Sequence, residues 1–209
     1  MIGIFGGAFD PVHLGHLKTI QYVLEQCQLE QIRLIPLANT VHKEQPLATP
    51  TQRVQMLQAA IASFDQFIVD EREVERKGSS YTVDTLKSLK KDLPDKNLCL
   101  ILGADAFNHF LSWREPEVIL ELANIVIMQR PNSPFSPNQE MKTLLKQHQA
   151  KDLEELKQSA AGSIYFQDVP QLAISSTQIR EHISKHQDVS SLLPESVFSL
   201  IKKWKLYQM

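Results

Sequence analysis

Two histidines that follow a pair of glycines are the residues whose types and spacing most clearly indicate chemistry. They lie in the segment Gly6–Leu17, which reads GGAFDPVHLGHL and follows a short apolar run. Glycines directly after a strand let backbone N–H groups approach a phosphate without interference from a Cβ atom. His13 and His16 are three residues apart, so in the first turn of a helix both imidazoles lie on one face. The segment therefore predicts a site where two imidazoles donate hydrogen bonds to an anion that the helix dipole also favours.

Other interpretations of the same segment are open. One imidazole can cap the helix while the other packs against it. In the ligand-binding interpretation, Gly15 between the histidines is expected to keep that helix face open to a ligand. Zinc coordination is a further alternative, although HLGH lacks the glutamate of HExxH and no third His or Cys stands at a suitable spacing. The segment is not a GxGxxG fingerprint, and the sequence contains no GxxxxGK[ST] loop.

A second motif, Ile174–Arg180, reads ISSTQIR and places hydroxyl side chains at the start of an expected helix. Ser and Thr in such a position accept hydrogen bonds from free backbone donors, so capping alone explains them structurally. The functional interpretation places the β- and γ-phosphates of a nucleotide at this helix N-terminus, with Arg180 one turn further on. A guanidinium offers a planar fork of donors that suits a phosphate.

Short apolar runs alternate with segments of helical period, and these elements must position the two motifs. The runs expected to form strands are Ile2–Phe5, Ile32–Ile35, Phe67–Val69, Leu98–Leu102, Ile125–Met128 and Ile164–Phe166. Helical segments are expected at Leu17–Leu24, Val54–Ile61, Val83–Leu93, Pro116–Leu122, 139–159, Thr177–Lys185 and Glu195–Lys205. Strands separated by helices indicate an α/β fold with a doubly wound parallel sheet of about six strands and helices on both faces. In such a sheet, ligands bind at the carboxyl ends of the strands.

Length and composition indicate a soluble protein of one domain. The 209 residues suit a single α/β domain, 1–209, whose C-terminal part (about 170–209) is expected to be helical and to carry the ISSTxIR motif. The 22 basic and 24 acidic residues give a net charge of −2, which argues against nucleic acid and membrane surfaces as partners. Cys27 and Cys99 are too few for a disulfide scaffold, and no signal peptide is apparent, so a cytoplasmic location is expected. The charged run Asp70–Lys77 is expected to form a solvated strand or hairpin edge.

Gly6–Leu17 resembles the signature of the HxGH nucleotidyltransferase superfamily, whose members transfer adenylyl or cytidylyl groups and have a Rossmann-like core. The pattern GG-x-FDPVHxGHL is most similar to that of the bacterial nicotinate-nucleotide adenylyltransferases, and later segments match in order and spacing along the whole chain. Ile174–Arg180 resembles the ATP-phosphate motif of the superfamily. The resemblance implies a Rossmann-like fold and an adenylyltransferase of NAD biosynthesis.

The same resemblance implies a set of site residues. ATP would contact Gly6, Gly7, Phe9, His13, His16, Lys43, Gly103, Asp105, Ser175, Ser176, Thr177 and Arg180. The mononucleotide would contact Thr82, Thr85, Asp105 and Trp113. The indole of Trp113 would stack on the pyridine ring, and Thr82 would contribute amide recognition of the nicotinate carboxylate. The family usually has prolines before a pair such as His42-Lys43, and Thr40-Val41 stand there in this sequence.

The implied reaction joins nicotinate mononucleotide and ATP to give nicotinate adenine dinucleotide and pyrophosphate. The 5′-phosphate attacks the α-phosphorus in line, without a covalent enzyme intermediate, so catalysis consists of positioning and neutralisation of charge. We expect His16 to contact the α-phosphate, with His13 supporting it. Arg180 and the amides of Ser176 and Thr177 would hold the leaving pyrophosphate. Mg²⁺ would bridge phosphate oxygens, and no residue is assigned as a metal ligand.

Other members of the superfamily and a non-catalytic protein are the alternatives. Phosphopantetheine adenylyltransferase and glycerol-phosphate cytidylyltransferase share the first turn, but they are typically shorter. They also lack the SYTxxTL segment, here Ser80–Leu86, and the GxD…W segment, here Gly103–Trp113. A nucleotide-binding regulator would keep the fold without catalysis, although both histidines and Arg180 are present here. The preference for nicotinate over nicotinamide follows from the resemblance alone, and the sequence indicates no protein partner.

Overall fold

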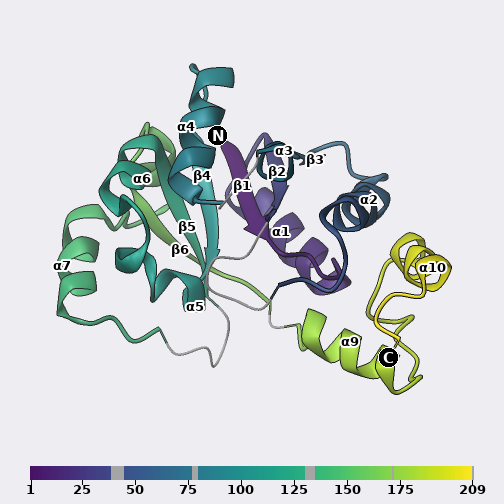
Figure 1. Cartoon of the computed structure of the whole chain (residues 1–209). Helices are drawn as coiled ribbons and strands as arrows, with labels where there is room; N and C mark the ends of the chain where they lie inside the picture. Colours follow the sequence, from purple (N-terminus) through teal and green to yellow (C-terminus); the bar gives the residue numbers. More distant parts are fainter. Residues whose placement is uncertain (39–44, 77–79, 130–134, 171, 209) are drawn as a thin grey trace. The chain divides into compact units, whose positions relative to one another are not determined.

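Six strands form one sheet in the computed structural model, which describes residues 1–38, 45–76, 80–129, 135–170 and 172–208 (Figure 1). The strands are β1 (Ile2–Gly7), β2 (Gln31–Pro36), β3 (Phe67–Val69), β4 (Leu98–Gly103), β5 (Ala123–Gln129) and β6 (Ile164–Asp168). Their order is β3-β2-β1-β4-β5-β6, and the pairing is parallel. The direction of winding reverses at the β1–β4 pair, as in a doubly wound Rossmann-like fold. The predicted α/β fold with six parallel strands is confirmed, and each strand overlaps its apolar run.

Helices connect these strands. They are α1 (Leu14–Gln26), α2 (Pro50–Ile61), α3 (Arg72–Glu75), α4 (Thr82–Asp92), α5 (Ala104–Phe107), the 3-10 turn η1 (Phe110–Ser112), α6 (Pro116–Leu122), α7 (Gln139–His148), α8 (Leu153–Gln158), α9 (Ser176–Ser184) and α10 (Glu195–Trp204). The helix-like region expected at 139–159 is two helices, because Asp152 accepts a hydrogen bond from the Glu155 N–H and caps a new helix. In the described ranges, no helix combines the length and the apolar character that crossing a membrane requires.

The chain divides into two compact units. Unit 1 consists of Met1–Phe5, Tyr22–Ile32 and Tyr81–Gln171, and unit 2 consists of Gly6–Gln21, Arg33–Ser80 and Leu172–Met209. In unit 1, all of β5 except its last residue is buried, and β1 packs so closely that a Cβ atom on Gly3 would lie 2.8 Å from Cγ1 of Ile32. Within unit 2, α10 packs against α2, which Figure 1 shows beside it.

The prediction of a solvated edge at Asp70–Lys77 is wrong for the residues that the structure describes. Residues Arg72–Glu75 form the short helix α3, and Asp70 is buried. The Asp70 carboxylate accepts hydrogen bonds from Arg33 at 2.9 Å and from Arg72 at 2.8 Å. Asp70 therefore pairs with Arg72 of the same run and with Arg33 of β2 instead of facing water, because a buried carboxylate needs such partners.

Candidate active site

His13 and His16 form a reciprocal pair at the start of α1 in unit 2. Their rings stack with centroids 3.7 Å apart, so the predicted proximity of the two imidazoles is confirmed. Nδ1 of His13 accepts the backbone N–H of His16, and Nδ1 of His16 accepts the backbone N–H of His13, both at 3.3 Å. This is the pattern of a capping box, built from imidazoles in place of the usual Ser and Glu. The capping alternative is therefore correct for both histidines.

The capping pattern also fixes the chemistry that the rings offer. A neutral imidazole whose Nδ1 accepts a hydrogen bond carries its proton on Nε2, which is then a donor. Two backbone groups at this helix start are engaged, since the N–H of Leu14 donates to the carbonyl of Leu192 at 3.0 Å and that of His16 donates to His13. The imidazoles are thus better suited to an anion here than these two amides.

Gly15 makes room for a side chain of the protein. A Cβ atom at this position would lie 2.9 Å from Nδ1 of His13 and 3.3 Å from Cβ of Ile174. The expectation that Gly15 keeps the face open to a ligand is therefore incomplete, because the glycine first admits the His13 ring. Phe9 is buried, has a φ of 50°, and contacts the His16 ring edge-on at a centroid distance of 5.4 Å.

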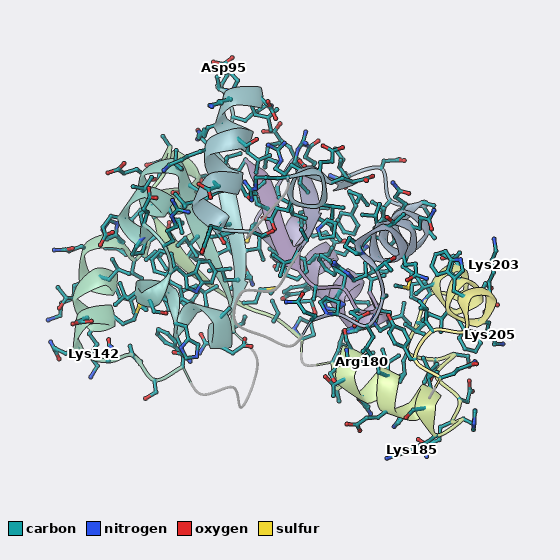
Figure 2. All side chains as sticks on the ribbon, in the orientation of Figure 1. Asp95, Lys142, Arg180, Lys185, Lys203 and Lys205 are labelled. Carbon is teal, nitrogen blue, oxygen red and sulfur yellow. The ribbon has the colours of Figure 1, made fainter. Side chains whose placement is uncertain are left out.

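The second motif lies against the first within unit 2. Ser176 donates its hydroxyl hydrogen bond to the carbonyl of Pro11 at 2.9 Å. Arg180 donates from Nη1 to the carbonyl of Asp10 at 2.7 Å and from Nη2 to the hydroxyl of Thr177 at 3.3 Å. Figure 2 labels Arg180 on α9 and Lys185 directly beyond the last residue of that helix. The structure therefore brings the HxGH turn and the start of α9 together, as the sequence predicts.

The first turn of α9 has donors of the kind that bind phosphates. Ser175 is the N-cap, and its hydroxyl accepts the N–H of Gln178 at 3.2 Å, so the capping interpretation holds for this serine. The N–H groups of the first helical residues, Ser176 and Thr177, have no acceptor within the helix. Together with the positive end of the helix dipole and a guanidinium one turn on, they form a favourable environment for an anion.

Gly6 and Gly7, the other predicted ATP contacts of this turn, end β1. Gly6 is exposed, and a Cβ atom there would approach nothing closer than the carbonyl oxygen of Ile35 at 3.9 Å. A Cβ atom on Gly7 would lie 3.0 Å from the ring of Phe9. Lys43 and its neighbour His42 lie outside the described residues.

Three residues that sequence reasoning did not select support this turn from inside unit 2. Asp10 is buried, and its carboxylate accepts the N–H groups of Leu47 and Ala48 at 2.8 and 3.0 Å. It also accepts the hydroxyl of Tyr207 at 2.7 Å. Arg53 is fully buried, and burial lowers the pKa of its guanidinium, although the nearby Asp10 acts to raise it. Arg53 lies on the buried face of α2, at helical spacing from Met56 and Leu57. A charged residue on an apolar helix face is the sequence signal that could have revealed its supporting role.

The residues predicted to bind the mononucleotide lie in unit 1. Trp113 is half-buried and directly follows η1, with its ring 5.8 Å from that of Phe110. Thr82 is the first residue of α4, whereas Thr85 is buried and has little surface to offer a ligand. Tyr81 is the N-cap of α4, and its side chain makes no capping hydrogen bond.

Gly103 and Asp105 follow the carboxyl end of β4, also in unit 1. Gly103 is the N-cap of α5, and Asp105 is exposed in the first turn of that helix. A Cβ atom on Gly103 would lie 2.5 Å from Oδ1 of Asp105, so only glycine allows this orientation of the carboxylate. An exposed carboxylate is suited to accept hydrogen bonds from ribose hydroxyls.

Comparisons with known proteins agree with this site and fold. The chain belongs to the cytidylyltransferase-like family, which matches residues 4–182, so the Rossmann-like sheet and the HxGH turn are those of a nucleotidyltransferase. Within that class, it belongs to the nicotinate-nucleotide adenylyltransferases, which make nicotinate adenine dinucleotide in NAD biosynthesis. The family and enzyme class that the sequence predicts are thereby confirmed, whereas the assignments of individual residues stay predictions.

Similar proteins cover nearly the entire chain. A probable nicotinate-nucleotide adenylyltransferase of Methylococcus capsulatus is 41% identical over 208 residues, which cover 99% of both chains. The Pseudomonas aeruginosa protein with the same description is 37% identical over 208 residues, or 99% of this chain and 97% of the relative. Plasmodium falciparum nicotinic acid mononucleotide adenylyltransferase complexed with NaAD has a TM-score of 0.73 at 20% identity, with 99% and 96% coverage, which shows the shared fold.

Proposed function

We propose that this chain transfers the adenylyl group of ATP to the 5′-phosphate of nicotinate mononucleotide and releases pyrophosphate. The observation that carries the proposal is the hydrogen bonding of α9 to the HxGH turn, through Ser176 to Pro11 and Arg180 to Asp10. Two motifs with donors for phosphate, more than 150 residues apart in the sequence, thereby form one cluster in unit 2. The similarity to nicotinate-nucleotide adenylyltransferases over the whole chain supports the choice of substrates.

In the proposed arrangement, the triphosphate of ATP lies on unit 2. Nε2–H of His16 donates to the α-phosphate, where negative charge accumulates in the transition state, and His13 holds that ring in place. The first amides of α9 and the guanidinium of Arg180 bind the departing pyrophosphate. The 5′-phosphate of the mononucleotide is already an anion at neutral pH, so it attacks the α-phosphorus without a side-chain nucleophile or general base. The bond from the α-phosphorus to the bridging oxygen breaks, and its electrons leave with pyrophosphate.

The pyridine end of the mononucleotide is assigned to unit 1. The half-buried ring of Trp113 provides an aromatic face for offset stacking on the pyridine. Thr82, at the start of α4, has a helix N-terminal amide that suits a carboxylate such as that of nicotinate. The exposed carboxylate of Asp105 is assigned to ribose hydroxyls, and Thr85 to packing behind Thr82.

Mg²⁺ accompanies ATP in the proposed function. Across the ranges that the structure describes, no group of three or more His, Cys, Asp or Glu side chains is arranged to hold a metal ion. We assign Mg²⁺ to the phosphate oxygens of ATP and to water, as is usual for this ion. Bound there, it would supply positive charge to the polyphosphate.

Pyrophosphate release is the experiment that tests the proposal. The purified chain is mixed with ATP and Mg²⁺ and, in parallel, with nicotinate mononucleotide, nicotinamide mononucleotide, phosphopantetheine or glycerol phosphate. We expect release with nicotinate mononucleotide, slower release with the nicotinamide form, and none with the other two. ATP binding without release from any acceptor would identify a nucleotide-binding regulator and contradict the proposed function.

A further inference from the structure

The carboxylate of Asp10 connects three separate segments of unit 2. Asp10 lies in the HxGH turn and is 5% exposed. Its Oδ2 accepts the N–H of Leu47 at 2.8 Å, and its Oδ1 accepts both the N–H of Ala48 at 3.0 Å and the hydroxyl of Tyr207 at 2.7 Å. The tyrosine is 197 residues away in the sequence, so its contact with Asp10 is purely tertiary.

Arg53 completes this cluster from α2. Its guanidinium donates to the carbonyl oxygens of Ala8 and Leu37, each at 2.7 Å, and of Ala38 at 3.2 Å and Ala48 at 3.3 Å. Arg53 therefore ties the turn, through Ala8, to the chain just after β2. Because the buried guanidinium is close to Asp10, each charge reduces the cost of burying the other.

The cluster of Asp10, Arg53 and Tyr207 thus holds the HxGH turn through both the side chain and the backbone of Asp10. The carboxylate of Asp10 faces Tyr207 and the backbone of residues 47–48, while its carbonyl accepts the guanidinium of Arg180 at 2.7 Å. A rotation of the Asp10 side chain would break these carboxylate contacts and move Oδ2 away from Nη1 of Arg180, which lies 3.9 Å from it. Tyr207 is well placed to prevent this rotation, because it is itself buried and supplies the one side-chain hydrogen bond to this carboxylate within 3.5 Å among the described residues.

We propose that Tyr207 is a positioning residue for the ATP site, which acts through Asp10 to hold the HxGH turn and Arg180 in place. The inference rests on the proposed function, because it takes that turn as the phosphate site. Burial raises the pKa of the Tyr207 phenol, as does the neighbouring Asp10 carboxylate, so the hydroxyl remains a donor across the working pH range. A tyrosine near the end of the chain thereby influences a site formed by its first residues.

The test compares Tyr207→Phe with Tyr165→Phe. Each substitution removes one hydroxyl and keeps the ring, and Tyr165 is a half-buried residue of β6 in unit 1 with no assigned role. For Tyr207→Phe we expect the ratio kcat/KM for ATP to fall about tenfold, while KM for nicotinate mononucleotide stays within about twofold of the wild type. Tyr165→Phe should leave both values within about twofold. A lower melting temperature of Tyr207→Phe with unchanged kcat/KM for ATP, or an equal rise in both KM values, would show a merely structural role and overturn the inference.

A double-mutant cycle tests whether Tyr207 acts through Asp10. If it does, Tyr207→Phe adds little to the loss of kcat/KM for ATP that Asp10→Ala causes alone, because alanine offers the Tyr207 hydroxyl no acceptor, whereas independent effects would multiply. Multiplied effects overturn the inference. Should Asp10→Ala not fold, Asp10→Leu takes its place in the cycle.

Calorimetric titration with ATP separates this inference from the proposed function. Wild-type protein that binds no ATP overturns the proposed function, and this inference with it. If the wild type binds ATP, and Tyr207→Phe has the same affinity and the same kcat/KM for ATP as the wild type, only the role of Tyr207 is overturned.

Discussion

Nδ1 of His13 accepts the backbone N–H of His16 at 3.3 Å, and Nδ1 of His16 accepts that of His13 at the same distance. One pair of side chains therefore starts α1 and at the same time carries its ring protons on Nε2, the nitrogen proposed to donate to a ligand. Structural and functional explanations of a short histidine motif are usually treated as competitors. Here the capping contact is what selects the tautomer that suits a phosphate.

Replacement of His16 by alanine tests the role of that donor. We expect kcat to fall by about 10²-fold or more with a modest change in KM, because a donor to the transition state is lost. His182→Ala, in the last turn of α9, is the matched control and should retain wild-type turnover. Near-normal turnover in folded His16→Ala protein would refute the assignment of His16.

Substitution of Trp113 tests the proposed binding site of the mononucleotide. Trp113→Ala should raise KM for nicotinate mononucleotide about tenfold and leave KM for ATP unchanged, because the stacking surface for the pyridine is lost. Trp113→Phe keeps an aromatic face and should recover most of the affinity. Steady-state kinetics with each substrate varied in turn measures both constants, and a parallel rise of the two would show that stacking is the wrong assignment.

Arg53 is expected to be a major contributor to stability. Arg53→Met removes the donors to four backbone carbonyls and one of the two positive charges near Asp10, so the free energy of unfolding should fall by about 3–5 kcal/mol. Arg53→Lys keeps the charge but has only three donors, and it should lose less. Guanidinium denaturation measures both variants, and a loss below about 1 kcal/mol for Arg53→Met would be inconsistent with this account.

Asp70 should make the stability of the fold depend on pH. Burial alone would raise the pKa of its carboxyl, but the hydrogen bonds from Arg72 and Arg33 outweigh burial and lower it. A lowered pKa in the folded state means that the ionised group stabilises the fold above its unfolded pKa of about 3.9. That contribution is lost as the pH falls through the folded-state value.

The corresponding measurement is the unfolding free energy of wild type and Asp70→Asn from pH 7 to pH 2.5. The difference between them should be about 2 kcal/mol at pH 7 and should shrink steadily below about pH 4. Asp65→Asn, at an exposed position, serves as the control and should behave as the wild type throughout. A difference for Asp70→Asn that stays constant down to the lowest pH would contradict the assigned ion pairs.

Much of the fold and the phosphate cluster could be predicted because their signals are local. Apolar runs such as Leu98–Leu102 have strand length and are bounded by turn residues, which fixes the type of element. The Gly6–Leu17 and Ile174–Arg180 motifs each combine several residue types in one short segment. The prediction at Asp70–Lys77 is wrong because the signal there is not local. A charged run indicates solvent exposure unless its distant partners are known, and Arg33 is 37 residues from Asp70 in the sequence.

The supporting cluster could not be predicted for the same reason. Asp10 and Tyr207 lie near opposite ends of the chain, and neither has a local pattern that marks it as buried. Arg53 did leave a signal, since Arg53, Met56, Leu57 and Ala60 follow the i, i+3, i+4, i+7 spacing of one buried helix face. An arginine in such a stripe indicates a buried hydrogen-bonded charge, but only the structure identifies its four carbonyl partners.

A crystal structure of the chain with a non-hydrolysable ATP analogue and Mg²⁺ is the decisive test of the proposed phosphate site. We expect the α-phosphate at hydrogen-bonding distance, about 3 Å, from Nε2 of His16, and the β- and γ-phosphates on the first amides of α9 and the guanidinium of Arg180. Phosphates bound elsewhere on the protein, with His13, His16 and Arg180 contacting only protein atoms, would contradict it.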